Sequence, residues 1–160
     1  MPDTPSFLAE RLLTEGNKSV QFFRDLPGEA WDRTIYTEGT TWKTIQVLAH
    51  FVATELSLYR LLENILGGGS GAPEDFDINA YNERKVTQLV NQDADTLLAK
   101  FLQQRAATAA LVSRLTQADL ERQGRHPFLG RTPLAEIIKI IYRHNQIHQR
   151  EMRKVLGENV

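Results

Sequence analysis

Two histidines four residues apart near the end of the chain are the residues best suited to carry chemistry. His144 and His148 stand in the run YRHNQIHQRE. A helix turns about 100° per residue, so side chains at this spacing lie on one face, one above the other. Neutral imidazole is the commonest protein metal ligand, and the pair could therefore give two nitrogens to one ion.

The same helix is predicted to carry both rings on its apolar side. The apolar arc consists of Leu134, Ile137, Ile141, Met152 and Val155. The opposite side gathers the cations Lys139, Arg143, Arg150, Arg153 and Lys154. Burial of unpaired polar groups is costly, and a metal ion would satisfy both rings. The alternative is a pair of core imidazoles hydrogen-bonded to carbonyl groups or to water.

A third ligand would have to come from another element. His50 is the leading candidate because it lies in an apolar helix, although periodicity does not orient it. Glu151 lies at the edge of the histidine arc. It could ligate the ion, accept a hydrogen bond from a ligand ring, or pair with Arg150 or Lys154 on the surface. His126 precedes a proline in a polar loop, where we expect it to be exposed; the alternative is that the loop lies near the mouth of the bundle and reaches the site.

Helical spacing dominates the rest of the chain. A capping Thr4-Pro5 opens a first helix that ends before Pro27-Gly28. Residues 29–39 read as a loop that returns Trp31 and Ile35 to the core. A second helix runs from 39–42 to about Leu66. It is apolar around most of its circumference, which predicts that it packs against other elements on more than one side.

The second half of the chain has the same character. Residues 67–73 have the composition of a flexible linker, and 77–91 predict a short helix. A long helix over 93–115 follows, and the last helix runs from Thr132-Pro133 to near Gly157. We find no alternating strand pattern. These elements predict an all-α four-helix bundle with a long crossover between its second and third helices.

Composition narrows the class of protein. With 160 residues, 41% hydrophobic and 24% charged, we predict one domain over 1–160. The absence of cysteine excludes disulfides, thiolate ligands and a cysteine nucleophile. A net charge of −1 without a basic patch argues against nucleic acid, and no apolar run is long enough for a membrane span. The N-terminus has no signal-peptide pattern, so we expect a cytoplasmic protein.

Three segments together resemble one family. Residues 41–50 (TWKTIQVLAH) resemble the W-x-x-x-x-V-L-A-H start of the second helix in the DinB/YfiT-like superfamily. His144 and His148 resemble its second metal motif, and residues 77–82 (DINAYN) resemble the D-x-x-x-[FY]-N stretch of relatives that include the mycothiol-dependent maleylpyruvate isomerases. The matching segments follow one another in the family's order and extend from the second helix to the last.

The resemblance implies a bundle of up-down-down-up topology, a three-ligand metal site at His50, His144 and His148 with water in the open position, and frequent homodimers. It also implies thiol-dependent transferase or isomerase chemistry with a low-molecular-weight thiol. In the isomerase branch an arginine after the linker holds substrate, and Arg84 lies in that region. The second domain common in that branch is absent from this sequence, so we do not expect activity on maleylpyruvate.

Two functions follow from these observations. The first is a metalloenzyme in which zinc or nickel activates a water or thiol for transfer to a small electrophile; ligand type alone does not separate these metals from iron or manganese. Substrate contacts would come from Gln46, Thr54, Tyr59 and Arg84. The second is a non-catalytic homodimeric module that holds a small ligand between helices, in ligand binding or a stress response. Neither involves nucleic acid or a membrane.

Overall fold

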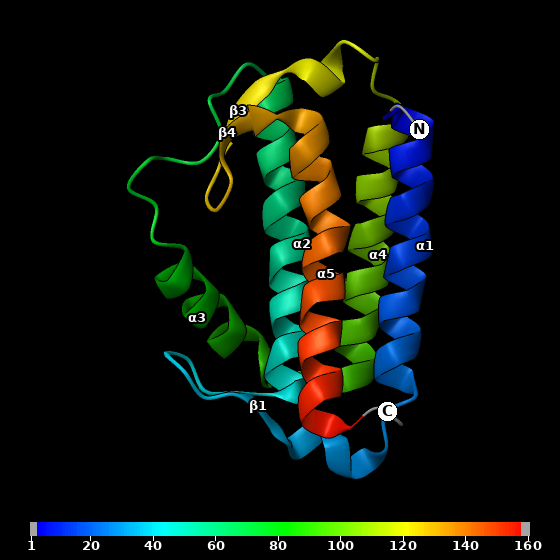
Figure 1. Cartoon of the computed structure of the whole chain (residues 1–160), viewed down its shortest axis with the longest axis vertical. Helices are drawn as coiled ribbons and strands as arrows, with labels where there is room; N and C mark the ends of the chain where they lie inside the picture. The colour runs from blue at the N-terminus through cyan, green and yellow to red at the C-terminus, as the bar shows by residue number, and fades with distance from the viewer. Residues whose placement is uncertain (1–2, 158–160) are drawn as a thin grey trace.

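The computed structural model describes residues 3–157; Met1 and Pro2 of the N-terminal stretch lie outside this range. Its long helices are α1 (Pro5–Arg24), α2 (Thr44–Leu66), α4 (Ala94–Ser113) and α5 (Leu134–Leu156), and α3 (Ile78–Leu89) is shorter. The four long helices form the predicted bundle. Helices α1 and α5 run in one direction and α2 and α4 in the other, which is the up-down-down-up topology (Figure 1).

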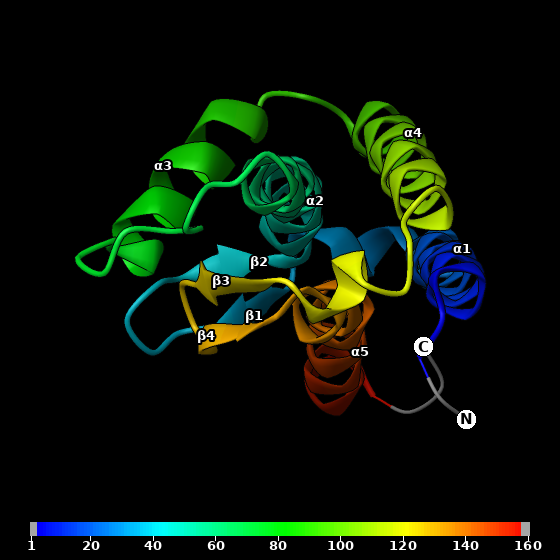
Figure 2. The ribbon, with the colours of Figure 1, turned by 90° about the horizontal axis from the view of Figure 1, so that it is seen from above.

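The bundle has α3 on its outside. Helix α4 packs against α1 and α2, and α5 packs against the same two helices from the other side. Seen from above, α3 lies beyond α2, on the side of the molecule that also carries the short strands (Figure 2). The apolar circumference of α2 is explained by this position, because α2 packs against α3, α4 and α5 together.

Side-chain caps fix where several helices begin. Thr4 Oγ1 accepts a hydrogen bond from Phe7 N at 3.1 Å. Asp77 accepts one from Ala80 N and Asp93 accepts one from Thr96 N. Each cap satisfies a backbone donor that has no partner within the helix. The helix starts predicted from the sequence at these positions are therefore confirmed.

The prediction that the chain contains no strands was wrong. Strands β1 (Thr34–Tyr36) and β2 (Trp42–Lys43) form one antiparallel pair, and β3 (Gln123–His126) and β4 (Gly130–Pro133) form another. Single 3-10 turns, η1 (Gly28–Asp32) and η2 (Asp119–Glu121), precede them. Each strand has only two to four residues, too few to display alternation.

The connection between α2 and α3 is anchored, which corrects its interpretation as a flexible linker. Ala72 N donates to Arg125 O at 2.8 Å, and Arg125 N donates to Ser70 O at 2.9 Å. Asn64 Oδ1 accepts from Gly71 N at 3.0 Å. The glycine-rich composition therefore serves a close backbone approach to β3 as well as a change of direction.

Gly71 is the position where this approach is tightest. Its φ is +92°, and a Cβ there would lie 2.5 Å from both the N and the O of Arg125. Gly68 has a similar φ of +97° but nothing within 4 Å. We expect Gly68→Ala to cost about 1–3 kcal/mol of unfolding free energy through backbone strain alone, and Gly71→Ala to cost clearly more. Urea denaturation of both variants measures the difference; equal losses would contradict the tight contact.

The core contains two apolar clusters with a polar layer between them. One cluster surrounds Phe23, Phe51 and Phe101, and the other surrounds Leu12, Leu62 and Ile137. Most residues expected on buried faces are buried. Val155 is a correction, since it is 38% exposed in the last turn of α5.

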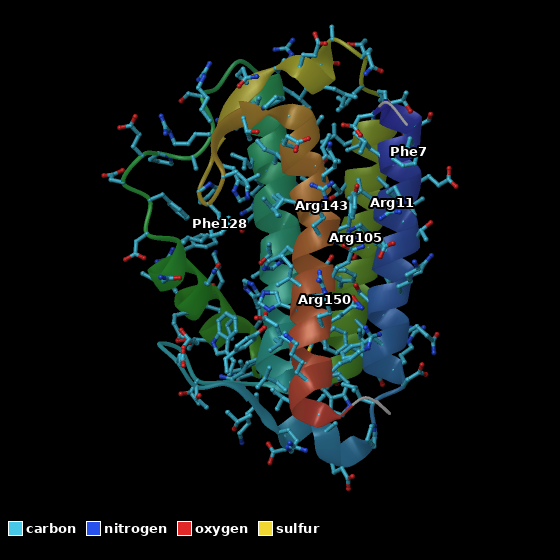
Figure 3. The ribbon with its side chains drawn as sticks, viewed as in Figure 1. Phe7, Arg11, Arg105, Phe128, Arg143 and Arg150 are labelled. Carbon is cyan, nitrogen blue, oxygen red and sulfur yellow. The ribbon has the colours of Figure 1, made fainter. Side chains whose placement is uncertain are left out.

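The polar layer is centred on Arg105, which projects from α4 into the bundle (Figure 3). Its Nε and Nη2 donate to the two carboxylate oxygens of Glu55, both at 2.7 Å. Nη1 donates to Leu12 O at 3.0 Å, and Nη2 also donates to Asn145 Oδ1. One guanidinium thus connects α1, α2, α4 and α5, and both charged side chains are almost fully buried.

No helix within residues 3–157 is both long enough and apolar enough to cross a membrane.

Candidate metal centre

The structure brings together the three predicted ligand histidines. His50 comes from the first half of α2, and His144 and His148 from successive turns of α5. Nε2 of His144 lies 3.0 Å from Nε2 of His50 and 2.9 Å from Nε2 of His148. One ligand nitrogen from each ring lies within 4.8 Å of the other two. The three rings therefore direct their Nε2 atoms toward a common point.

This spacing suits a small divalent ion. Zinc binds imidazole nitrogen at about 2.0–2.1 Å, so two nitrogens on one tetrahedral ion are roughly 3.3 Å apart. The two short pairs observed here are within a few tenths of an ångström of that separation. Nδ1 of His144 is buried and has no hydrogen-bond partner among the described residues. The hydrogen-bonding contacts of this ring are thus concentrated at Nε2, inside the cluster.

The other nitrogens of two rings are held by neighbouring hydroxyl groups. Tyr36 donates its hydroxyl hydrogen to Glu151 Oε1 at 2.5 Å, and the hydroxyl oxygen of Tyr36 lies 2.5 Å from Nδ1 of His148. The hydroxyl must therefore accept from His148 Nδ1–H, which leaves a lone pair on Nε2. Thr54 Oγ1 lies 3.3 Å from Nδ1 of His50 and can accept from it in the same way.

Burial keeps the three rings neutral, which is the form that binds metal. It lowers the pKa of His50 to about 3, with a smaller contribution from His148. Burial also lowers the pKa of His144 well below its usual value, and that of His148 despite the opposing charge of Glu151. Trp42 and Phe51 supply the aromatic surroundings, with the Trp42 ring 4.9 Å from the His50 ring.

A cavity of about 570 Å³ opens beside the cluster. It lies between α2, α3, α5, the anchored connection and the β3–β4 hairpin, and His50 and His144 form part of its wall. The other lining side chains are Thr54, Ser57, Leu58, Arg60, Leu61, Asn64, Ala72, Pro73, Phe76, Ile78, Asn79, Tyr81, Asn82, His126, Pro127, Phe128, Ile140 and Ile147. Its size is that of a site for a small organic molecule.

Of the four residues predicted to contact substrate, one lines the cavity and three do not. Thr54 lines the cavity and contacts His50. Gln46 accepts a hydrogen bond from Lys43 N at 2.7 Å and so caps α2. Tyr59 and Arg84 lie outside the cavity lining, and the exposed Arg84 guanidinium stacks on the Tyr81 ring. A role in substrate binding stays a prediction for all four residues.

Sequence reasoning missed Tyr36 and predicted the wrong exposure for His126. Tyr36 lies in the segment interpreted as a loop, and only its pairing with β2 brings it to His148. His126 was expected to be exposed, but it is 9% exposed and lines the cavity. The β3–β4 hairpin, which the sequence pattern does not reveal, turns its ring inward.

The fold and the cluster define a class: four-helix bundles with three histidines held between facing helices. The chain belongs to the DinB superfamily, whose family model matches residues 11–152. Among curated proteins, none matches this sequence.

Solved structures share the fold at low sequence identity. One is YfiT from Bacillus subtilis, described as a probable metal-dependent hydrolase with an unusual four-helix bundle topology. Its sequence is 19% identical to this one, and the two structures superpose with a TM-score of 0.76 over 94% of this chain and 85% of the YfiT chain. A mycothiol-dependent maleylpyruvate isomerase is 16% identical with a TM-score of 0.66, over 92% of this chain and 59% of its own. The colibactin self-resistance protein ClbS, solved with double-stranded DNA, is 13% identical with a TM-score of 0.65, over 94% of each chain.

Proposed function

We propose that His50, His144 and His148 hold one divalent metal ion, zinc or nickel, and that the protein is an enzyme acting on a small electrophilic substrate in the adjacent cavity. The observation that carries the proposal is the convergence of three Nε2 atoms from two helices beside that cavity. Three protein ligands leave a position open, which is typical of catalytic rather than structural sites.

The metal would lower the pKa of a bound water or thiol and so supply a nucleophile at neutral pH. The residues of the chain have distinct parts in this scheme. Tyr36 and Glu151 keep the proton of His148 on Nδ1. The apolar wall of the cavity would hold the substrate beside His50 and His144. Because the chain has no cysteine, any thiol must be a low-molecular-weight one that enters with the substrate.

Relatives in fold support this choice of chemistry. YfiT is described as a probable metal-dependent hydrolase, and the isomerase among the similar structures depends on mycothiol. These descriptions concern other proteins. They make water and small thiols the first nucleophiles to test with this one.

Elemental analysis of protein purified without a polyhistidine tag tests the metal directly. We expect about one zinc or nickel per chain, and its loss in each of His50→Ala, His144→Ala and His148→Ala. The matched control is His126→Asn, which changes the fourth histidine of the chain and should retain the metal. Circular dichroism checks that the variants remain helical. Unchanged metal content in the three alanine variants, or no metal after zinc and nickel are supplied, would overturn the proposal.

Tyr36→Phe should weaken metal binding about 10–100-fold. The substitution removes the hydroxyl that holds the His148 ring in the required tautomer, while the ring of residue 36 still packs on Trp42. Calorimetric titration with zinc measures the change. Tyr59→Phe is the control, because this tyrosine lies on α2 outside the cavity lining. Equal affinities for the two variants would contradict a role for Tyr36.

A non-catalytic ligand-binding module is the second candidate, because the cavity would serve it equally well. Assays of the zinc- and nickel-loaded protein with several small thiols and a panel of electrophiles distinguish the two. Turnover that disappears in His148→Ala would support the enzyme. Ligand binding without turnover would favour the module.

We also propose that the protein is a homodimer. The support is the resemblance to a family in which homodimers are frequent. Light scattering coupled to size-exclusion chromatography tests this, and a mass of one chain would contradict it.

A further inference from the structure

His126 is a buried histidine whose role the metal site does not explain. It ends β3 and is 9% exposed. Its Nδ1 lies 3.0 Å from Phe128 N and 3.1 Å from Leu129 N. Both backbone groups are donors, so Nδ1 must accept from them. The hydrogen of the neutral ring is therefore on Nε2.

This leaves an open donor on the wall of the cavity. The His126 ring lines the same cavity as His50 and His144. Within residues 3–157, the hydrogen bonds of the His126 ring all involve Nδ1, and none involves Nε2. Burial lowers the pKa of His126 to about 4, so the ring offers one neutral N–H rather than a positive charge. A ligand oxygen in the cavity would satisfy this donor.

The rest of the wall limits the ligand further. Apolar side chains predominate, and Phe128, 81% exposed at the tip of the hairpin, extends the apolar surface at the cavity (Figure 3). No carboxylate is among the described residues of the lining, so a cationic ligand would have no counter-charge. The one lining residue with a permanent charge is Arg60, whose side chain is exposed and therefore well hydrated.

We propose that the cavity binds a mainly apolar molecule bearing a carbonyl group, and that Nε2–H of His126 donates a hydrogen bond to the carbonyl oxygen. This inference deepens the proposed function: the carbonyl compound would be the electrophilic substrate, bound beside His50 and His144. It rests on the proposed function for the reaction only. The binding contact itself requires no metal.

A matched pair of probes isolates the contact. 2-Acetylnaphthalene and 2-ethylnaphthalene have nearly the same shape and differ in the carbonyl oxygen. We expect the ketone to bind wild-type protein about fivefold more tightly, in both metal-free and zinc-loaded forms. The ketone should also shift the NMR resonance of His126 Nε2–H downfield, and the hydrocarbon should not. Equal binding of the probes, no binding of either, or an unmoved resonance would overturn the inference.

Two substitutions separate the two nitrogens of the ring. In His126→Asn the amide oxygen stands near the position of Nδ1, so the acceptor for the hairpin is kept and the cavity donor is lost. In His126→Gln the amide nitrogen can reach the position of Nε2. We expect the asparagine variant to lose the fivefold preference while its affinity for the hydrocarbon is unchanged, and the glutamine variant to retain most of the preference.

The outcomes also separate this inference from the proposed function. A ketone preference that survives His126→Asn, or that occurs only with zinc, would assign the carbonyl to another group and overturn the role of His126. A preference that is present without metal and lost in His126→Asn would support it. In that case failure to bind zinc would contradict the proposed function alone.

Discussion

Arg105→Met is expected to lower the free energy of unfolding by about 3–5 kcal/mol. The substitution leaves the Glu55 carboxylate buried without its cation and removes the donors to Leu12 O and Asn145. Loss of one partner of a buried pair costs more than the pair itself contributes, because the remaining charge is desolvated and uncompensated. Urea denaturation at pH 7.5 measures the loss.

Two further variants show that the cost comes from burial. Arg122→Met removes a similar ion pair with Asp119, but Arg122 is 48% exposed, and we expect a loss below about 1 kcal/mol. The double variant Arg105→Met/Glu55→Leu should recover most of the stability of the wild type, since no buried charge remains. A loss below 1 kcal/mol in Arg105→Met alone would contradict the importance of the buried pair.

The burial of Arg105 could have been predicted from the sequence. Arg105 follows Phe101 by four residues and precedes Thr108 by three, so it falls on the face of the helix that was predicted to be buried. Its partner could not be assigned in the same way, because Glu55 lies on the second helix, which is apolar around most of its circumference and gives no direction to one side chain.

The histidine cluster could be predicted only in part. The i, i+4 spacing places His144 and His148 on one face whatever the rest of the fold, because the relation is local. His50 was the leading candidate for a third ligand because it lies in an apolar helix, but an all-round apolar helix gives no direction to one ring. Its convergence with the other two depends on how α2 packs against α5, which is a long-range property.

Helical spacing could not place Tyr36 and His126 in the site. Both belong to hairpins of two to four residues per strand, whose pairing is decided by contacts with the bundle rather than by alternation of side chains. The β3–β4 hairpin is also held by the connection from α2, through Ser70 and Ala72. Residues of the site that lie on short irregular segments therefore become visible only once the bundle is assembled.

The metal-free protein is expected to lose stability steeply below pH 6.5. Burial lowers the pKa of His50 to about 3 and of His126 to about 4, and it also lowers those of His144 and His148. Above pH 6.5 these histidines are neutral in both states, and their contribution to stability is complete. Below it, the unfolded chain binds protons that the folded chain cannot, so the free energy of unfolding falls as the pH falls.

The expected loss between pH 6.5 and pH 5 is about 3 kcal/mol from His50 and His126 together, and the other two histidines increase it. Most carboxylates titrate below this window, so the slope reports chiefly on histidine. Urea denaturation at several pH values measures it. His126→Phe should reduce the slope by about 1.4 kcal/mol per pH unit whatever its effect on stability at pH 7.5, because one titrating group is removed. A stability that stays constant from pH 7 to pH 5 would show that the four rings are not held neutral in the folded protein.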